Sequence, residues 1–335
     1  MNQDTRDIKT ICLNCFNTLD KKGVCPYCGK KADDGINPSA TLPMRTFLKE
    51  RYVIGKVLGV GGFGLTYLGW DTQRCAKVAI KEFFPRGYVV RIKHNRVNVK
   101  SPDTLDSFNH WLKAFVQEAQ MLTRINHLQG VVKIQDYFEE NGTAYIVMEY
   151  LEGVSLRNYL TTRGHKIPVD EALRIMRPLL EALIVLHQYG VIHRDISPEN
   201  IQIVENRYVK LIDFGAAQLF NAPPVEKPFV VLKPGYSPIE SYYPKNYKQG
   251  PWTDVYQVGA TIYNSITGYI PSSATDRAKA DNLPRPSALG AHVAVAVENA
   301  IMKAMALYPQ NRYTSAAEFK QMLYGEFMPW LRKRP

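Results

Sequence analysis

The sequence predicts an α+β protein, because strand-like runs are concentrated in residues 52–151 and helical patterns dominate the remainder. From Tyr52 onward, short runs of β-branched and aromatic residues alternate with turns that contain Gly or Asp. Apolar residues at helical spacing extend from about Leu105 to Ile125 and recur after Pro168. The 335 residues leave room for one large or two medium domains.

Composition and charge are those of an ordinary globular protein. Apolar residues make up 45% and charged residues 22% of the chain, and no run approaches the ~18 apolar residues of a membrane helix. The polar, acidic start at residues 1–4 predicts no secretory signal and a cytoplasmic location. The net charge of +11 is compatible with nucleic acid, anionic membrane or acidic substrates, but solvated surface lysines and arginines explain it more simply.

Four of the five cysteines fall within the first 28 residues. Cys12 and Cys15 form one C-x-x-C pair, and Cys25 and Cys28 form a second pair, with Pro inside it and Gly after it. Two such pairs can wrap one tetrahedral Zn²⁺, and a segment this small would take its folding energy from the metal. Two disulfides or redox pairs are the alternatives, which a cytoplasmic setting disfavours. Cys75 stands alone and is expected to be an inert thiol.

A polar octet, HRDISPEN at 193–200, lies between two short apolar runs. It contains a carboxylate, Asp195, and a carboxamide five residues later, Asn200. This spacing lets one loop present a base to a hydroxyl and an oxygen ligand to a metal. A second carboxylate, Asp213, opens an Asp-Phe-Gly turn after another strand-like run. In this order the two motifs resemble the H-R-D-x-x-x-x-N and D-F-G motifs of the protein kinase family.

The resemblance implies an ATP site. The G-x-G-x-x-G run at 59–64 precedes a strand rather than a helix, which favours a kinase-type hairpin over a dinucleotide-binding turn. In the V-A-I-K motif, Lys81 would contact the α- and β-phosphates and pair with Glu118, while Met148 would be the gatekeeper. The backbones of Glu149 and Leu151 would bond adenine. The implied ATP-binding residues are Leu58, Gly59, Gly61, Gly62, Phe63, Gly64, Thr66, Ala79, Lys81, Met148, Glu149, Leu151, Asn200 and Asp213.

The resemblance also implies the reaction. Asp195 would orient and deprotonate an acceptor hydroxyl, and Asn200 and Asp213 would bind Mg²⁺. The run Ser-Pro-Glu-Asn at 197–200 is similar to the K-P-E-N of serine/threonine kinases, so Ser or Thr acceptors are expected. A ribbon fused to a kinase, together with V-A-I-K-E-F-F-P and L-K-P-G-Y-S-P-I-E, is similar to bacterial eukaryote-type Ser/Thr kinases.

The expected fold is a bilobal kinase with an N-lobe β-sheet plus one main helix, a mostly helical C-lobe, and ATP between them. We expect a tail and zinc ribbon at 1–30, a linker at 31–51, the kinase domain at 52–325 and a C-terminal tail at 326–335. The linker predicts that ribbon and kinase each have their own core. Three structural details are also expected: an extra hairpin of unassigned function within 82–104, Asp254 bracing the catalytic loop, and Glu240 paired with Arg312.

Two other classes of function stay open. A pseudokinase-type nucleotide-binding scaffold is favoured by the altered Ser197 and opposed by the intact catalytic set. A nucleic-acid adaptor built on the ribbon is weak, because the ribbon has only Phe16 and Tyr27 for stacking. The expected cofactors are therefore ATP, Mg²⁺ and structural Zn²⁺, and the expected partner is a protein with a Ser or Thr acceptor. The ribbon is a candidate docking site for a further partner; no nucleic acid and no membrane segment are expected.

Two departures from the family pattern concern the activation segment. No Ser, Thr or Tyr lies between Ala216 and Gly235, which predicts activation without phosphorylation there. Arg194 would instead meet Glu226, or the segment would be held by its prolines, Pro223, Pro224 and Pro228. The family's catalytic-loop Lys is replaced by Ser197, and Lys233 stands where Ser/Thr kinases place a Thr. This exchange makes Lys233 a candidate catalytic cation beside Asp195.

Overall fold

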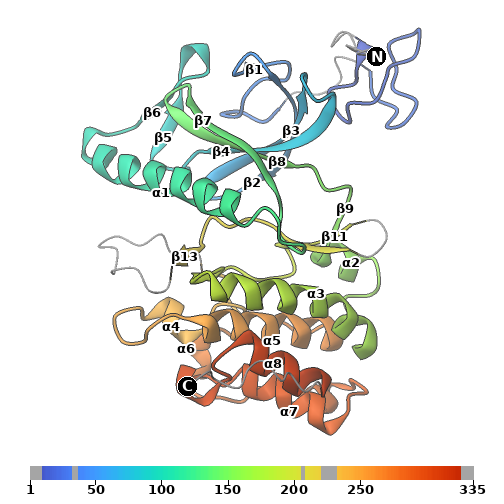
Figure 1. Ribbon diagram of the computed structural model, residues 1–335, viewed down its shortest axis with the longest axis vertical. Helices are drawn as coiled ribbons and strands as arrows, with labels where there is room; N and C mark the ends of the chain where they lie inside the picture. Colours follow the sequence, from blue (N-terminus) through green and yellow to red (C-terminus); the bar gives the residue numbers. More distant parts are fainter. Residues whose placement is uncertain (1–9, 32–36, 205–207, 220–231, 326–335) are drawn as a thin grey trace. The chain divides into compact units, whose positions relative to one another are not determined.

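A computed structural model of the chain describes residues 10–31, 37–204, 208–219 and 232–325 (Figure 1). The chain divides into two compact units. The first contains residues 1–127 and 132–151, and the second contains 128–131 and 152–335.

The first unit is built on a six-stranded antiparallel sheet with the order β1-β2-β3-β4-β8-β7 (Figure 1). Its strands are β1 (Phe47–Leu48), β2 (Tyr52–Val60), β3 (Gly64–Asp71), β4 (Ala76–Phe83), β7 (Ile134–Glu140) and β8 (Thr143–Glu149). One long helix, α1 (Leu105–Arg124), packs against β7 and β8. The apolar spacing read from the sequence is the reason for this packing, because α1 buries one face through Phe108, Phe115, Ala119 and Leu122.

The segment between β4 and α1 contains the predicted hairpin. Its strands, β5 (Val89–Arg91) and β6 (Val97–Val99), pair antiparallel. Arg91 donates a 2.7 Å hydrogen bond to Glu82 of β4, whose carboxylate is fully buried. The same carboxylate accepts hydrogen bonds from the Tyr67 and Tyr145 hydroxyls at 2.7 and 3.0 Å. The buried charge of Glu82 is therefore compensated, and the hairpin is fastened to the sheet.

The cysteine-rich segment shares a hydrophobic cluster with the sheet. Its side chains Ile11, Leu13 and Phe16 are buried together with Val53 of β2 and with Leu68 and Trp70 of β3. Leu68 and Trp70 are two residues apart and so point to one face of the sheet. The Phe16 ring stacks on the Trp70 ring with centroids 5.8 Å apart. The expectation of separate cores for ribbon and kinase is therefore wrong: the ribbon buries its apolar side chains against β2 and β3.

A glycine makes this close packing feasible. The backbone N–H of Lys56 donates to the Leu13 carbonyl at 3.1 Å, so the two segments approach directly. A Cβ atom on Gly55 would lie 2.4 Å from that carbonyl oxygen and 2.9 Å from the Phe16 ring. Any side chain at position 55 would force the ribbon away from β2.

The second unit is mainly helical. Its long helices are α3 (Val169–Gln188), α5 (Pro251–Thr267), α7 (Val295–Ala304) and α8 (Ala316–Tyr324), and they pack on one another. Helix α5 is buried on every side from Thr253 to Ile266, as expected for the helix at the centre of a core. The short elements are β9 (Gly153–Ser155), α2 (Leu156–Thr161), β10 (Val191–Ile192), β11 (Ile201–Val204), β12 (Val209–Leu211), β13 (Gln218–Leu219), α4 (Ile239–Tyr242) and α6 (Ala274–Arg277).

Two small sheets in this unit frame the polar octet. Strand β11 lies between β12 and β9, and β10 pairs with β13. Residues 193–200 therefore connect β10 to β11 as a loop, as the flanking apolar runs predict. The predicted pair of Glu240 and Arg312 is confirmed, because both side chains are fully buried and joined by hydrogen bonds of 2.6 and 3.0 Å. None of the helices in the described parts of the chain combines the length and the apolar composition of a membrane span.

Replacing Phe16 with Ala should destabilise the first unit as well as the ribbon. The ring is 1% exposed, and truncating such a side chain typically costs about 3–5 kcal/mol in free energy of unfolding. Thermal and denaturant unfolding of the full chain would measure the loss. The matched control is Tyr27→Ala, since Tyr27 is also on the ribbon but 76% exposed, and it should change stability by less than ~0.5 kcal/mol. Equal stability of the Phe16 variant and the wild type would contradict a shared core.

Candidate active site and metal centre

The loop at 193–200 is held by the buried helix α5. The carboxylate of Asp254 accepts hydrogen bonds from the backbone N–H groups of His193 and Arg194 at 2.9 and 2.8 Å. The His187 Nε2 atom bonds the same carboxylate at 2.9 Å. Burial alone would raise the pKa of Asp254, but the His187 hydrogen bond and charge and the His193 N–H bring it below its usual value. This geometry agrees with the prediction that Asp254 braces the loop at 193–200.

A second side chain of α5 continues this brace. Gln257 accepts from the backbone N–H of Ile196 at 3.0 Å and donates to the carbonyl of Arg194 at 2.7 Å. Gln257 was not among the residues singled out from the sequence. Its position three residues after Asp254 places both on one helix face, and this spacing is the signal that could have found it.

Asp195 lies at the centre of the loop and is 7% exposed. The Asn200 amide donates to one Asp195 carboxylate oxygen at 2.7 Å and to the Asp195 carbonyl at 2.8 Å. Lys233 bonds both carboxylate oxygens at 2.9 and 3.0 Å. Burial raises the pKa of Asp195 to about 6, although the Lys233 ammonium opposes the rise. The structure thus brings together three of the predicted catalytic residues.

Asp213 follows β12 in a left-handed backbone conformation with φ of 61°. Its carboxylate accepts from the Gly215 N–H at 3.3 Å, and the neighbouring Ile212 N–H donates to the Asn200 carbonyl at 2.9 Å. That backbone hydrogen bond joins the two segments that carry Asn200 and Asp213. The Asn200 amide nitrogen is committed to Asp195, so its side-chain oxygen is the atom available to a cation.

The D-F-G phenylalanine is seated on the H-R-D histidine. The rings of Phe214 and His193 meet edge to face with centroids 4.5 Å apart. Burial lowers the pKa of His193 to about 4, so the ring is neutral at pH 7. Its Nδ1 atom accepts the backbone N–H of Asp195 at 3.2 Å. A neutral, buried histidine therefore orients the backbone of Asp195.

Lys81 and Glu118 form the predicted ion pair in the first unit. The Lys81 Nζ atom lies 3.7 Å from the Glu118 carboxylate. Lys81 is on β4 opposite Thr66 of β3, and Thr66 in turn pairs with Gly59 of β2. Adjacent strands thus carry the lysine and the start of the glycine-rich turn.

The glycine-rich turn is a hairpin between β2 and β3, as the sequence predicts. Gly61 donates its N–H to the Gly64 carbonyl at 2.9 Å, and the Phe63 ring rests edge-on against Trp111 of α1 at 5.4 Å. Leu58, Gly59 and Gly62 are exposed, and a Cβ atom at Gly59 or Gly62 would meet nothing within 4 Å. The backbone here is open to a large ligand.

The predicted adenine-contacting residues lie at the end of β8. Met148 pairs with Ala79 of β4, which keeps the small side chain and the gatekeeper on neighbouring strands. The Glu149 N–H donates to the Lys133 carbonyl at 3.0 Å. An adenine contact by Glu149 would therefore use its carbonyl, and Leu151 comes two residues later.

Arg194 has partners that the sequence did not indicate. Its Nε atom donates to the Ala216 carbonyl at 2.5 Å, and Nη1 donates to the Gln249 side chain at 2.9 Å. Burial lowers the pKa of this guanidinium to about 10. The expected partner Glu226 and the prolines Pro223, Pro224 and Pro228 lie outside the described residues. Gln249 is 55 residues away in sequence, so no local pattern could have predicted the contact.

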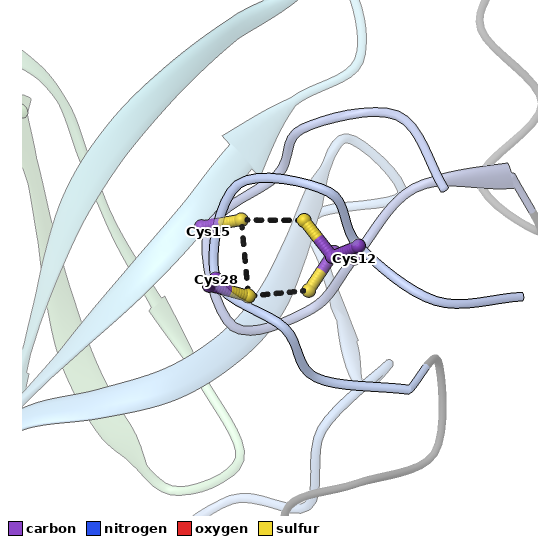
Figure 2. A group of neighbouring side chains, drawn as sticks. Cys12, Cys15 and Cys28 are labelled. Atoms are coloured by element: carbon purple, nitrogen blue, oxygen red, sulfur yellow. Dashed lines mark hydrogen bonds between the residues drawn. The ribbon is translucent and has the colours of Figure 1, made fainter. Parts of the chain in front are cut away.

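The four ribbon cysteines form one cluster, in which all four sulfur atoms lie within 4.8 Å of one another. Figure 2 labels Cys12, Cys15 and Cys28 of this cluster. The Sγ–Sγ distances are 3.5 Å for Cys12–Cys28, 3.4 Å for Cys15–Cys25 and 3.6 Å for Cys15–Cys28. A disulfide needs about 2.05 Å. Four Zn–S bonds of about 2.3 Å in a tetrahedron place the sulfur atoms about 3.8 Å apart. The cluster therefore fits one tetrahedral metal ion rather than two disulfides.

Both cysteine pairs are followed by a left-handed residue. Gly29 has φ of 68°, and the Gly29 N–H donates to the Cys25 carbonyl at 2.8 Å. The corresponding residue after the first pair is Phe16, with φ of 53° and an N–H bonded to the Cys12 carbonyl at 2.6 Å. The two turns thus repeat one backbone arrangement, with a non-glycine residue in the strained position only where its ring packs on Trp70.

Comparison with known proteins agrees with this geometry. A family model described as protein kinase domain matches residues 52–324. The chain is 32% identical over 282 residues to the serine/threonine-protein kinase PrkC of Bacillus subtilis (strain 168), a match that covers 82% of this chain and 40% of PrkC. It is 30% identical over 288 residues to the serine/threonine-protein kinase PknB of Mycobacterium tuberculosis (strain H37Rv), covering 82% and 42% respectively. The chain thus spans about two fifths of the length of these curated relatives.

A solved structure titled "PpkA-294 apo form" superposes with a TM-score of 0.73 and 29% identity, covering 85% of this chain and all of that one. The chain therefore belongs to the protein kinase family, and it has the family's fold of an N-lobe sheet with one main helix and a mostly helical C-lobe. The domain boundaries expected above stay a prediction.

Phosphatase treatment should leave phosphoryl transfer by this chain unchanged. In many kinases a phosphate compensates the H-R-D arginine, whereas here Arg194 already has the Ala216 carbonyl and Gln249 as acceptors. The measurement compares initial rates of phosphatase-treated and untreated protein, with mass spectrometry to verify the phosphate content. Loss of activity on treatment, with recovery after autophosphorylation, would contradict this expectation.

Proposed function

We propose that this chain is an ATP-dependent protein serine/threonine kinase that transfers the γ-phosphoryl group to a protein hydroxyl. The proposal rests on the fixed position of the Asp195 carboxylate. Asn200 donates a hydrogen bond to it, and helix α5 holds the surrounding loop in place. A general base has to be held within hydrogen-bond reach of the hydroxyl it deprotonates, and this loop supplies that rigidity. The Ser-Pro-Glu-Asn run and the serine/threonine kinase names of the relatives support Ser or Thr acceptors.

The proposed work of the remaining residues follows from their chemistry. Lys81, held by Glu118, would position the phosphates, and the open backbone at 59–64 would cover them. The side-chain oxygens of Asn200 and Asp213 fit Mg²⁺, a hard cation that prefers oxygen ligands. When bound, Mg²⁺ offsets negative charge on the transferred group. Asp195 would take the proton of the acceptor hydroxyl.

We also propose that Cys12, Cys15, Cys25 and Cys28 bind one structural Zn²⁺, since a closed set of four thiolates is typical of structural zinc sites. Such a site has no open position for catalysis. Docking of a further partner on the ribbon stays a prediction; the ribbon's apolar side chains Ile11, Leu13 and Phe16 already face the sheet.

Replacing Asp195 with Asn should reduce phosphoryl transfer by about 10²–10⁴-fold and leave ATP affinity nearly unchanged. The amide keeps the size of the side chain but cannot accept the proton. A radiolabelled ATP transfer assay with a library of Ser/Thr peptides, and calorimetric titration of ATP, would measure the two quantities. The exposed Asp103→Asn is the matched control and should behave as wild type. Wild-type turnover in Asp195→Asn would refute the assigned base. A wild-type protein that binds ATP without transfer would instead support the pseudokinase scaffold.

Elemental analysis should find one zinc per chain, and X-ray absorption should find four sulfur ligands at about 2.3 Å. Because the ribbon shares its core with β2 and β3, removing the metal should lower the unfolding temperature of the first unit as well as unfold the ribbon. Cys15→Ser should lose the metal, whereas Cys75→Ser, which changes the exposed fifth thiol, should retain it. Protein with no zinc, or with fewer than four sulfur ligands, would overturn the assignment.

A further inference from the structure

The side chain of Lys233 ends on the catalytic loop. Its Nζ atom lies 2.9 and 3.0 Å from the two carboxylate oxygens of Asp195, and 3.0 Å from the Ser197 hydroxyl. Ser197 is fully buried, and Asp195 nearly so, while the Lys233 side chain is 27% exposed. A partly exposed side chain thus brings its ammonium group into contact with two buried side chains of the loop.

The backbone of Lys233 is fixed, so this contact is not the chance position of a long side chain. The Lys233 N–H donates to the Ser237 hydroxyl at 2.8 Å, and the Lys233 carbonyl accepts from the N–H groups of Tyr236 and Ser237 at 3.0 and 2.8 Å. Gly235 completes the turn with φ of 88°, and a Cβ atom there would lie 2.6 Å from the Pro271 carbonyl oxygen. The turn at 233–237 thus presents the lysine from a rigid base.

Side-chain hydrogen bonds of Tyr236 connect this turn to the helical core. The Tyr236 hydroxyl donates to the Asn264 side chain of α5 at 2.9 Å and accepts from Arg157 of α2 at 3.1 Å. Arg157 also pairs with Glu199 at 2.8 Å, so the turn and the catalytic loop share one network. Lys233 is consequently held in register with Asp195 by contacts that do not involve its own ammonium group.

We propose that Lys233 is a catalytic residue that contacts the γ-phosphoryl group during its transfer; this inference rests on the kinase function proposed above. An acceptor hydroxyl bonded to Asp195 lies about 2.6–3.2 Å from that carboxylate, and the phosphorus it attacks lies about 3–3.5 Å further on. An ammonium that already touches both carboxylate oxygens can reach the oxygens of a phosphoryl group at that distance. The positive charge is thereby placed where negative charge is being transferred.

The step balances as an ordinary phosphoryl transfer. The acceptor oxygen forms a bond to the γ-phosphorus, and the bond between that phosphorus and the bridging oxygen of ADP breaks. The hydroxyl proton goes to Asp195, and ADP leaves with the electron pair. Lys233 neither gains nor loses a proton; it contributes only electrostatic stabilisation, which is worth most when the group is preorganised.

Ser197 explains how the loop accommodates this lysine. Its hydroxyl is a small, neutral partner that fills one side of the ammonium at 3.0 Å. A long cationic side chain at 197 would compete with Lys233 for the same place beside Asp195. Positions 197 and 233 are therefore exchangeable: either one can supply the cation, but two long cationic side chains would not both fit beside Asp195.

The test compares Lys233→Ala with wild type in kcat, ATP Kd and affinity for ADP with aluminium fluoride, a planar mimic of the transferred group. We expect kcat to fall about 10²-fold, the loss typical of one electrostatic donor, with ATP Kd unchanged. Binding of ADP–aluminium fluoride should weaken in Lys233→Ala and be retained in Asp195→Asn, because the mimic requires no base. Lys245→Ala, at an exposed lysine of the same unit, is the matched control and should match wild type.

Two further variants distinguish a catalytic role from a structural one. Lys233→Gln keeps a hydrogen-bond donor without the charge, so it should fold and still lose turnover if Lys233→Ala proves unstable. The double variant Ser197→Lys, Lys233→Thr should recover part of the lost kcat, whereas independent sites would show additive damage. Near-normal kcat in both single variants at position 233, or a loss of kcat with full affinity for the aluminium fluoride complex, would overturn the proposal. Absence of transfer by the wild type would count against the kinase function itself, not against Lys233 alone.

Discussion

The position of the loop at 193–200 depends on one buried carboxylate. Asp254 lies within a helix that is buried on all sides, where an uncompensated charge would be strongly destabilising. Two backbone N–H groups of the loop and His187 satisfy it, so the carboxylate and the loop can only be stable together. The loop in turn contains Arg194 in a left-handed conformation with φ of 66°, a strain that persists because Asp254 and Gln257 fix the backbone on both sides of it.

Beyond this brace, side-chain contacts rather than helices or strands connect the loop to other segments of the second unit. Arg194 reaches the Ala216 carbonyl and Gln249, and His193 supports Phe214, so the turn at Asp213 is fastened to the loop at several points. The far end of the activation segment is held independently by the buried pair of Glu240 and Arg312. The loop that contains Asp195 and the turn that contains Lys233 are thus both bonded to α5, and the proposed electrostatic role of Lys233 requires such a fixed arrangement.

The sequence predicts local and motif-borne features of this protein well. The hairpin at 59–64, the helix from Leu105 and the Lys81–Glu118 pair follow from spacing and from the family resemblance, and the structure contains all three. Contacts between segments that are far apart in the sequence could not be predicted, because they depend on how the folded chain packs. Gln249 reaches Arg194 across 55 residues, and the hairpin predicted within 82–104 gave no sign that its Arg91 would compensate Glu82.

The ribbon shows why a short linker in the sequence does not guarantee a separate core. A segment of about twenty residues buries too little surface to be stable alone, so its apolar side chains need an external partner. The sheet has the complementary need, because the apolar side chains of Val53, Leu68 and Trp70 share one face of β2 and β3 that the ribbon covers. Phe16 accepts a left-handed backbone to place its ring there, and Gly55 removes the side chain that would prevent the approach.

The cysteine cluster therefore stabilises more than the ribbon. The four clustered cysteines belong to the same short segment as Phe16, whose ring packs on Trp70, and Trp70 belongs to the strand that carries Gly64 and Thr66 at its other end. The glycine-rich turn and the contact of Phe16 with Trp70 therefore lie at opposite ends of β3, and the cysteine-rich segment supports the end away from the turn.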